Sequence, residues 1–140
     1  ELLYSDIQKL NNSNSVDIPT YDYKTHTRKK NKLTIKKTDI IILEGIFSIY
    51  DKKIRNLIDL KIFLDTSEKT RIKRRIIRDK KSRARTEESI LRQYKNTVKP
   101  MYEKFVKPLK KHSDLIIKDN SINCNEYNIL NNYINSILNI

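Results

Sequence analysis

Three short apolar runs constrain the fold of this chain more than any other feature. They lie at residues 40–43, 60–64 and 115–117 and are rich in isoleucine and leucine. Runs that are apolar on both faces are typical of strands buried in a parallel sheet. Helical patterns separate the runs, so the sequence predicts an α/β fold with helices flanking a parallel sheet.

Apolar residues at helical spacing predict the remaining elements. The expected helices cover residues 2–10, 68–81, 87–98, 102–111 and 126–138. The third should end near Lys99, because a following proline disfavours helix in the residue before it. Alternating residues over 18–36 predict a small hairpin. No internal repeat is evident.

Composition limits the class of protein. With 140 residues and 37% hydrophobic content, the chain is expected to form one domain over 1–140. A single cysteine and only two histidines exclude a disulfide framework and a zinc cluster. The chain begins with Glu rather than Met and has no membrane span or secretory leader, so we expect a piece of a longer, cytoplasmic protein.

The net charge of +13 would suggest a polyanionic partner. Lys, Asn and Ile, however, make up 57 of the 140 residues, a bias that a coding sequence rich in A and T explains more simply. Arginine departs from this bias. Residues 71–85 contain six Arg and three Lys, whereas the rest of the chain contains three Arg and eighteen Lys. Because arginine binds phosphate and carboxylate in a fixed fork geometry, this segment indicates a geometric requirement.

The Arg-rich segment has three interpretations: a solvated helix face, a nucleic-acid-binding helix, or a lid that closes over transferring phosphates. Arg83 and Arg85 alternate just beyond the expected helix end. Two such side chains on a movable segment could reach one ligand and stabilise the charge of a transition state. This spacing favours the lid.

Three further residues could contact a ligand. Glu44 follows the first apolar run, where an acid in a nucleoside-triphosphate enzyme holds magnesium, although it could also be an ordinary strand-ending acid before the turn residue Gly45. Tyr21 and His26 belong to a polar segment suited to a small polar ligand, or they are a packing and an incidental loop residue. Gly45 is the chain's only glycine, so no G-x-x-x-x-G-K-S/T phosphate loop occurs in these 140 residues.

Taken together, four segments resemble the uridine kinase branch of the phosphoribulokinase/uridine kinase family. Residues 18–28 resemble I-P-x-Y-D-[FY]-x-[ST]-H-[ST]-R, and residues 42–46 resemble [VI]-[LF]-E-G-I. Residues 65–85 follow D-T, R-R-x-x-R-D and R-G-R, and residues 93–100 match Q-Y-x-x-x-V-K-P. The resemblance extends from about residue 1 to the last expected helix.

The resemblance implies a P-loop NTPase-type parallel sheet with a small hairpin and an Arg-rich helical lid over 71–85. It implies phosphoryl transfer from ATP or GTP, with Mg²⁺, to the 5′-hydroxyl of uridine or cytidine. The implied roles are base contact by Tyr21 and His26, nucleoside binding by Arg85 and Gln93, magnesium binding by Glu44, and triphosphate binding by Arg75, Arg78 and Arg83.

The same resemblance implies small-molecule partners, namely a pyrimidine nucleoside and a nucleoside triphosphate. Nucleic acid and membrane are not expected, and relatives often form homotetramers. Without a phosphate loop, the 140 residues should be inactive alone. Two alternatives remain open: a non-catalytic or degenerate kinase-like module whose Arg-rich helix binds RNA or another polyanion, and another family member such as a phosphoribulokinase or pantothenate kinase. The His26 segment with Gln93 favours a nucleoside.

One residue departs from the family pattern. The sequence has Arg83-Ala84-Arg85 where the family has R-G-R. If the backbone φ angle at Ala84 is negative, the change is mild, whereas a positive φ would strain lid closure and lower activity.

Overall fold

The computed structural model describes residues 2–22, 25, 27–118 and 124–139. It divides into two compact units, Glu1–Glu44 and Gly45–Ile140, which are described one at a time. The single domain expected from the sequence stays a prediction.

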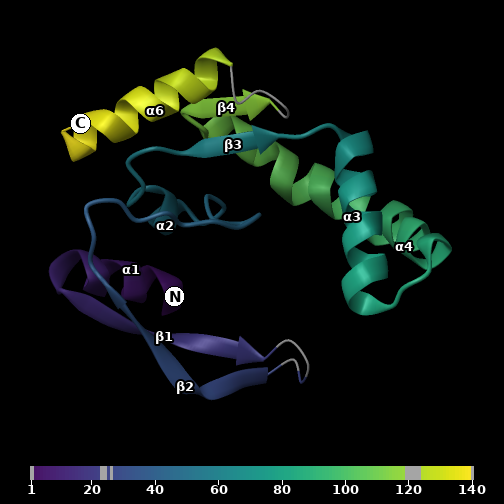
Figure 1. The fold of residues 1–140 in the computed structure, drawn as a ribbon, viewed down its shortest axis with the longest axis horizontal. Coiled ribbons are helices and arrows are strands. Elements are labelled where there is room, and N and C mark those ends of the chain that lie inside the picture. Colours follow the sequence, from purple (N-terminus) through teal and green to yellow (C-terminus); the bar gives the residue numbers. More distant parts are fainter. Residues whose placement is uncertain (1, 23–24, 26, 119–123, 140) are drawn as a thin grey trace. The chain divides into compact units, whose positions relative to one another are not determined.

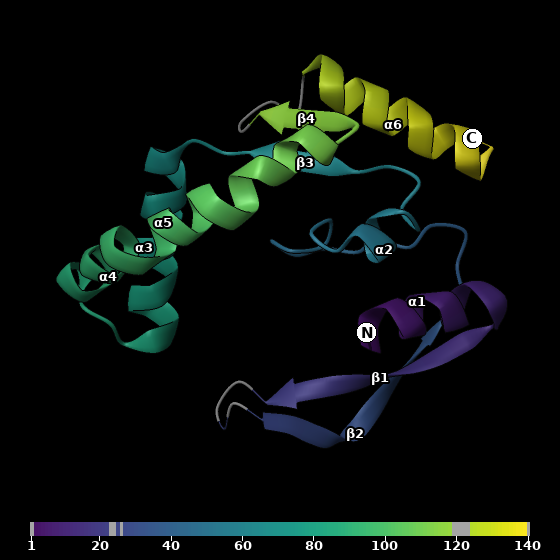
Figure 2. The ribbon, with the colours of Figure 1, turned by 180° about the vertical axis from the view of Figure 1, so that it is seen from behind.

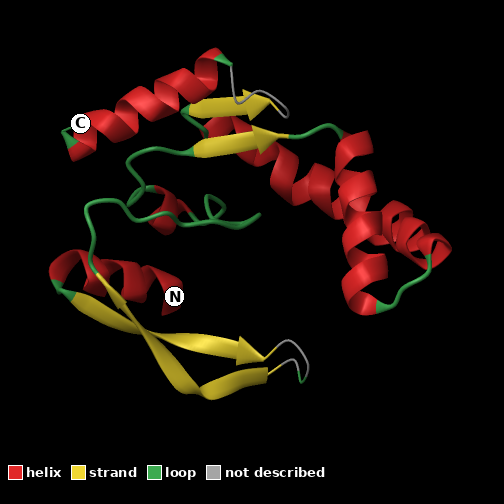
Figure 3. Cartoon of the chain, in the orientation of Figure 1, coloured by secondary structure: helices red, strands yellow, loops and turns green. Residues whose placement is uncertain are grey.

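The first unit consists of a helix and a hairpin (Figure 3). The helix α1, Leu2–Asn12, precedes the antiparallel strands β1, Ser15–Asp22, and β2, Thr27–Lys36. The predicted hairpin is therefore present and begins three residues earlier than expected. Val16 alternates with exposed residues along β1 and is buried, as is Leu10 of α1. The apolar face of the hairpin thus packs on the helix.

The second unit is built around two parallel strands, β3, Ile62–Asp65, and β4, Leu115–Lys118. Their register places Ile62 opposite Leu115. Phe63 of β3 packs with Ile49 and Leu109 in the buried core. The C-terminal helix α6, Asn125–Leu138, packs on β4 (Figures 1 and 2). Mixed α/β structure is confirmed, and so are two of the three predicted strands.

The prediction of a strand at the first apolar run is wrong. Residues 40–43 form no strand, and the side chain of Ile42 is 83% exposed. A strand that is apolar on both faces needs hydrogen-bonding neighbours and covering layers. In the described ranges, strands pair only as β1 with β2 and β3 with β4, so this run has no partner there.

A short helix, α2, Lys52–Arg55, was not expected from the sequence. Asp51 caps it, since its Oδ1 accepts hydrogen bonds from the amides of Lys53, at 2.7 Å, and Ile54, at 3.1 Å. These bonds satisfy donors that the first helical turn leaves unpaired. The bond from Ile54 also lowers the pKa of the Asp51 carboxyl. The sequence signal for this helix was Asp51 itself, because aspartate is favoured at the residue that caps a helix N-terminus.

The Arg-rich helix α3, Glu68–Arg83, begins after Ser67, which accepts a hydrogen bond from the Thr70 amide. Its successor α4, Glu87–Gln93, begins after Thr86 in the same way. From there the chain stays helical to His112. The successive segments are the π-helical η1, Tyr94–Val98; α5, Lys99–Met101; the π-helical η2, Tyr102–Val106; and the 3₁₀-helical η3, Lys107–His112.

The predicted helix end near Lys99 is therefore wrong, and the π-helical segments explain why. A proline inside an α-helix lacks an amide donor and clashes with the carbonyl four residues earlier. Just before Pro100, the Lys99 amide bonds the carbonyl of Tyr94, five residues back. A π-helical turn widens the helix at this point and accommodates the proline ring.

The same solution occurs twice, because the sequence repeats. Residues 94–101, YKNTVKPM, and 102–109, YEKFVKPL, share Tyr, Val, Lys and Pro at matching positions. The amide of Lys107, before Pro108, likewise bonds the carbonyl of Tyr102. The expectation of no internal repeat is corrected accordingly. The eight-residue spacing places both tyrosines toward α3, as described below.

Ile90 of α4 is buried and provides a stability test. Its side chain is 0% exposed. We expect Ile90→Ala to lower the free energy of unfolding by about 3 kcal/mol, through lost burial and the cavity left behind. Urea denaturation of the full-length protein measures this. The control is Leu91→Ala, at a position 41% exposed, which should cost under about 1 kcal/mol; equal costs would contradict the packing described.

Candidate functional site

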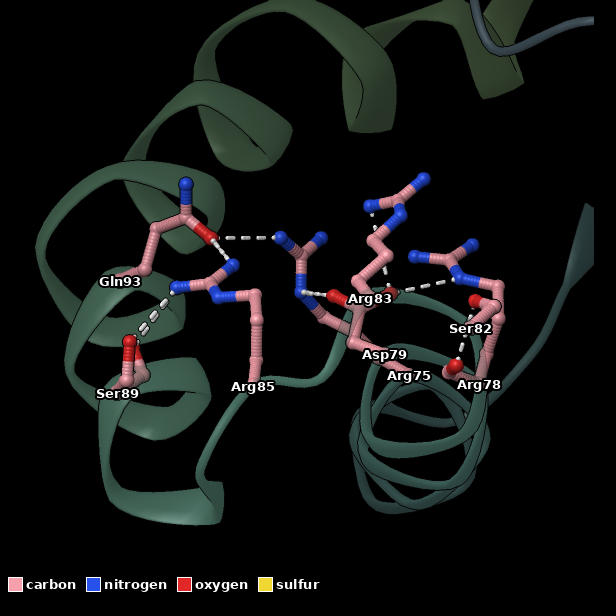
Figure 4. Close-up of polar contacts among 8 residues, drawn as sticks. All are labelled: Arg75, Arg78, Asp79, Ser82, Arg83, Arg85, Ser89 and Gln93. Atoms are coloured by element: carbon pink, nitrogen blue, oxygen red, sulfur yellow. Dashed lines mark hydrogen bonds and ion pairs between the residues drawn. The ribbon is translucent and has the colours of Figure 1, made fainter. Parts of the chain in front are cut away.

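Three arginines of α3 gather around one carboxylate (Figure 4). The Nε of Arg78 donates to Oδ1 of Asp79 at 2.9 Å. The Nη1 of Arg83 lies 3.3 Å from the same oxygen, and the Nε of Arg75 lies 3.6 Å from Oδ2. Arg75 and Arg83 are one helical turn before and after Asp79, where helix geometry favours side-chain contact, and Arg78 reaches the carboxylate from the preceding position.

Asp79 is fully buried, yet it is ionised at neutral pH. Burial alone would raise the pKa of its carboxyl. The hydrogen bond from Arg78 and the positive charges of Arg78, Arg83 and Arg75 outweigh burial and hold the pKa below its usual value. The carboxylate is therefore a fixed negative charge among the arginines.

A second cluster centres on Gln93, at the end of α4 (Figure 4). Its Oε1 accepts hydrogen bonds from Nη1 of Arg85, at 2.6 Å, and from Nη2 of Arg75, at 3.0 Å. The other terminal nitrogen of Arg85 donates to the hydroxyl of Ser89 at 3.0 Å and to its carbonyl at 3.3 Å. Arg75 therefore contacts both clusters.

The structure thus brings together five of the residues singled out from the sequence. Arg85 and Gln93, expected to bind one ligand, are in direct contact. Arg78 and Arg83, expected to bind another, share Asp79. Arg75 was grouped with the triphosphate residues, and its hydrogen bond to Gln93 links it to the other group as well. The roles of these residues stay predictions.

Helix α3 is braced by the long helical segment that follows α4. The guanidinium carbon of Arg71 lies 3.6 Å from the ring centroid of Tyr102, a cation–π contact. Lys99 and Glu68 form an ion pair at 2.9 Å. Tyr94 is buried nearby, and burial raises the pKa of its hydroxyl. The π-helical repeat therefore positions Tyr94 and Tyr102 against the helix that carries the arginines.

The predicted base-contacting residues belong to the first unit. Tyr21 is partly exposed on β1, in a pair with Arg28 of β2. The prediction for His26 lies outside the described residues. Tyr21 therefore keeps the surface position that a ligand contact requires, and its role stays a prediction.

Glu44 was expected to hold magnesium. It is exposed and follows residues that form no strand. Among the described residues, no three His, Cys, Asp or Glu side chains are grouped so that they could hold a metal ion. Magnesium usually keeps several waters and binds one or two carboxylates together with substrate phosphates. A single exposed carboxylate fits that mode as one ligand and does not form a site by itself.

Ala84 adopts the left-handed conformation, with φ 49° and ψ 36°. Its amide bonds the carbonyl of Asp79, and the Arg85 amide lies 3.4 Å from the same carbonyl. The turn that directs Arg85 toward Gln93 therefore requires a positive φ at Ala84. Of the two cases considered from the sequence, the strained one, with a positive φ at Ala84, is observed.

Comparison with known proteins identifies the relationship. The model of the Phosphoribulokinase / Uridine kinase family matches residues 1–125. Curated relatives named "Uridine kinase" include one from Clostridium novyi, 44% identical over 138 residues, which are 99% of this chain and 66% of that protein. The relative from Staphylococcus epidermidis strain RP62A is 42% identical over 138 residues, and that from Macrococcus caseolyticus is 41% identical over 140. These alignments cover 99% and 100% of this chain, and 67% and 68% of the relatives.

The fold and these matches define part of a kinase. The chain belongs to the phosphoribulokinase/uridine kinase family and spans about two thirds of the length of these relatives. In the part of the chain that the structure describes, the helices are all too short or too polar to cross a membrane.

The strain at Ala84 predicts that Ala84→Gly stabilises the protein. An L-residue in the left-handed region carries a penalty of about 1–2 kcal/mol, and glycine removes it while losing more freedom on folding. We expect a net gain of about 1 kcal/mol in the free energy of unfolding, measured by urea denaturation of the full-length protein.

The control is Lys73→Gly, at an exposed position in the interior of α3. There glycine should cost about 1 kcal/mol. Loss of stability in both variants would show that Ala84 is not strained.

Proposed function

We propose that this chain is the nucleoside-binding and lid part of a uridine/cytidine kinase. The reaction is transfer of the γ-phosphoryl group of ATP or GTP to the 5′-hydroxyl of uridine or cytidine, a step of pyrimidine salvage. The 140 residues contain no phosphate-binding loop, so we propose that they are inactive alone.

Two kinds of support converge on this proposal. The relatives that match nearly the whole chain, at 41–44% identity, carry the name uridine kinase. The observation that carries the assignment within the chain is the convergence of Arg75 and Arg85 on the Oε1 of Gln93. This contact presets the polar groups proposed to receive the nucleoside, and a mismatched ligand would leave them unpaired.

The proposed roles of the arginines and Gln93 follow the two clusters. Arg85 and Gln93 bind the nucleoside; Tyr21 and His26, which belong to neither cluster, are assigned to it by the family resemblance alone. Arg78 and Arg83, whose side chains are 55% exposed, reach the triphosphate together with Arg75. Their positive charges offset the negative charge on the transferring group, as in other phosphoryl-transfer enzymes.

Magnesium completes the proposed site. It bridges phosphate oxygens in such reactions and neutralises developing charge. Glu44 would hold it, directly or through water, as one carboxylate among ligands that the triphosphate itself supplies. The exposure of Glu44 leaves its carboxylate accessible to an ion.

The experiment is steady-state kinetics of the full-length protein with uridine, cytidine, ATP and GTP. Arg85→Ala and Gln93→Ala should each raise the KM for the nucleoside at least tenfold, because a lost hydrogen bond from a charged group costs about 1.5–3 kcal/mol. The KM for the triphosphate should stay within threefold of the wild-type value.

Arg92→Ala is the matched control. It removes an exposed arginine adjacent to Gln93 that has no assigned role in the site. Its KM for uridine should equal that of the wild type. No nucleoside phosphorylation by the wild-type protein, or equal nucleoside KM values in all variants, would overturn the proposal. Retained RNA binding by an inactive wild-type protein would favour a polyanion-binding module.

A further inference from the structure

Asp79 is a charged side chain with no solvent exposure, near the C-terminal end of the Arg-rich helix. Burying a carboxylate carries a large desolvation cost, which good partners must offset. Its partners here are three arginines that the proposed reaction uses. The buried carboxylate therefore acts on those arginines. It is not part of the apolar core cluster, which is formed by Ile49, Phe63 and Leu109.

The contacts are made at one edge of each guanidinium group. Asp79 meets Arg78 and Arg75 through their Nε atoms and Arg83 through Nη1. Each guanidinium carries five N–H donors, so contact at one edge leaves donors for a second anion. Arg78 and Arg83 each keep 55% of the side chain exposed. Asp79 thus fixes the direction of the arginine side chains and leaves some of their N–H donors available to a ligand.

The charges of the cluster do not balance. Three guanidinium groups carry +3 and one carboxylate carries −1, which leaves +2 at the end of α3. The Oδ2 of Asp79 accepts no hydrogen bond from the described residues, although it is buried. An internal pairing that only stabilised the helix would neutralise its charges. An excess of two positive charges is suited to an incoming polyphosphate.

We propose that Asp79 is a positioning residue that holds Arg75, Arg78 and Arg83 in the arrangement that receives the transferring phosphoryl group. The inference rests on the proposed kinase function. Asp79 itself does not touch the substrate. It acts by fixing the near edges of the guanidinium groups before the triphosphate arrives, so that little reorganisation remains at the moment of transfer.

Loss of the Asp79 charge should have different effects if Asp79 positions the arginines than if it only supports binding of the triphosphate. Asp79→Asn removes a negative charge near the phosphates, so attraction of the triphosphate is not weakened. The amide nitrogen it introduces cannot accept a hydrogen bond, so the neutral side chain keeps one acceptor oxygen for only part of the cluster and holds the guanidinium groups less firmly. Misplaced catalytic groups cost up to about 100-fold in rate. The effect should therefore appear in kcat and not in the KM for ATP.

The test is kinetics of full-length Asp79→Asn with uridine and ATP, with the folded fraction measured by circular dichroism. We expect kcat per folded molecule to fall by about 10–100-fold, and the KM for ATP to stay within threefold of wild type. The matched control is Glu87→Gln, the same loss of charge at an exposed residue on the next helix. It should keep both constants.

Asp79→Glu keeps the charge and moves the carboxylate by one methylene group. It should fold, keep the KM for ATP and give a kcat between those of the wild type and Asp79→Asn. It also decides the case in which Asp79→Asn does not fold, because a wild-type kcat in Asp79→Glu would then overturn the inference.

Three other results would overturn it. A wild-type kcat in folded Asp79→Asn would show that the charge is not needed. A raised KM for ATP with unchanged kcat would show that Asp79 supports binding only. A wild-type protein without kinase activity would overturn the proposed function and this inference together, whereas an active wild type with unaffected variants overturns the inference alone.

Discussion

The ionised carboxylate of Asp79 is the constraint on which the end of α3 depends. A buried charge is tolerated only where opposite charges and hydrogen bonds compensate its lost hydration. Arg75, Arg78 and Arg83 supply that compensation. The backbone carbonyl of the same residue accepts the amides of the turn that follows. Side-chain and main-chain bonds to one aspartate therefore fix three arginines and the direction of the loop.

The loop direction in turn depends on a strained residue. The Ala84 backbone must be left-handed for Arg85 to leave α3 toward Gln93, and an alanine accepts this conformation only when surrounding bonds enforce it. The enforcing bonds go to Asp79 and Gln93. The buried charge at Asp79 is thus offset by Arg75, Arg78 and Arg83, and the strain at Ala84 by main-chain bonds to Asp79 and the contact of Arg85 with Gln93.

Sequence reasoning predicted the features that local pattern controls. The parallel pair of β3 and β4, the hairpin and the Arg-rich helix follow from apolar periodicity, and the Arg-Ala-Arg departure pointed to the residue that proves strained. The run at residues 40–43 shows the limit, because an apolar run forms a strand only where other segments pair with it. Pro100 misled for a related reason: a π-helical turn overrides the usual proline rule. The role of Asp79 was missed, although an acid one turn from two arginines was a readable signal.

The contacts of Gln93 fix the orientation of its side-chain amide. Two guanidinium donors on its Oε1 fix which end of the amide faces the arginines, since only the oxygen can accept. The amide nitrogen is then the end left to donate. The 2-carbonyl oxygen of a pyrimidine ring or a ribose hydroxyl can accept from it, and both uridine and cytidine carry these groups. In the proposed nucleoside site, Gln93 would therefore recognise either pyrimidine nucleoside through these groups, and discrimination between uridine and cytidine would come from groups that contact the 3- and 4-positions of the base.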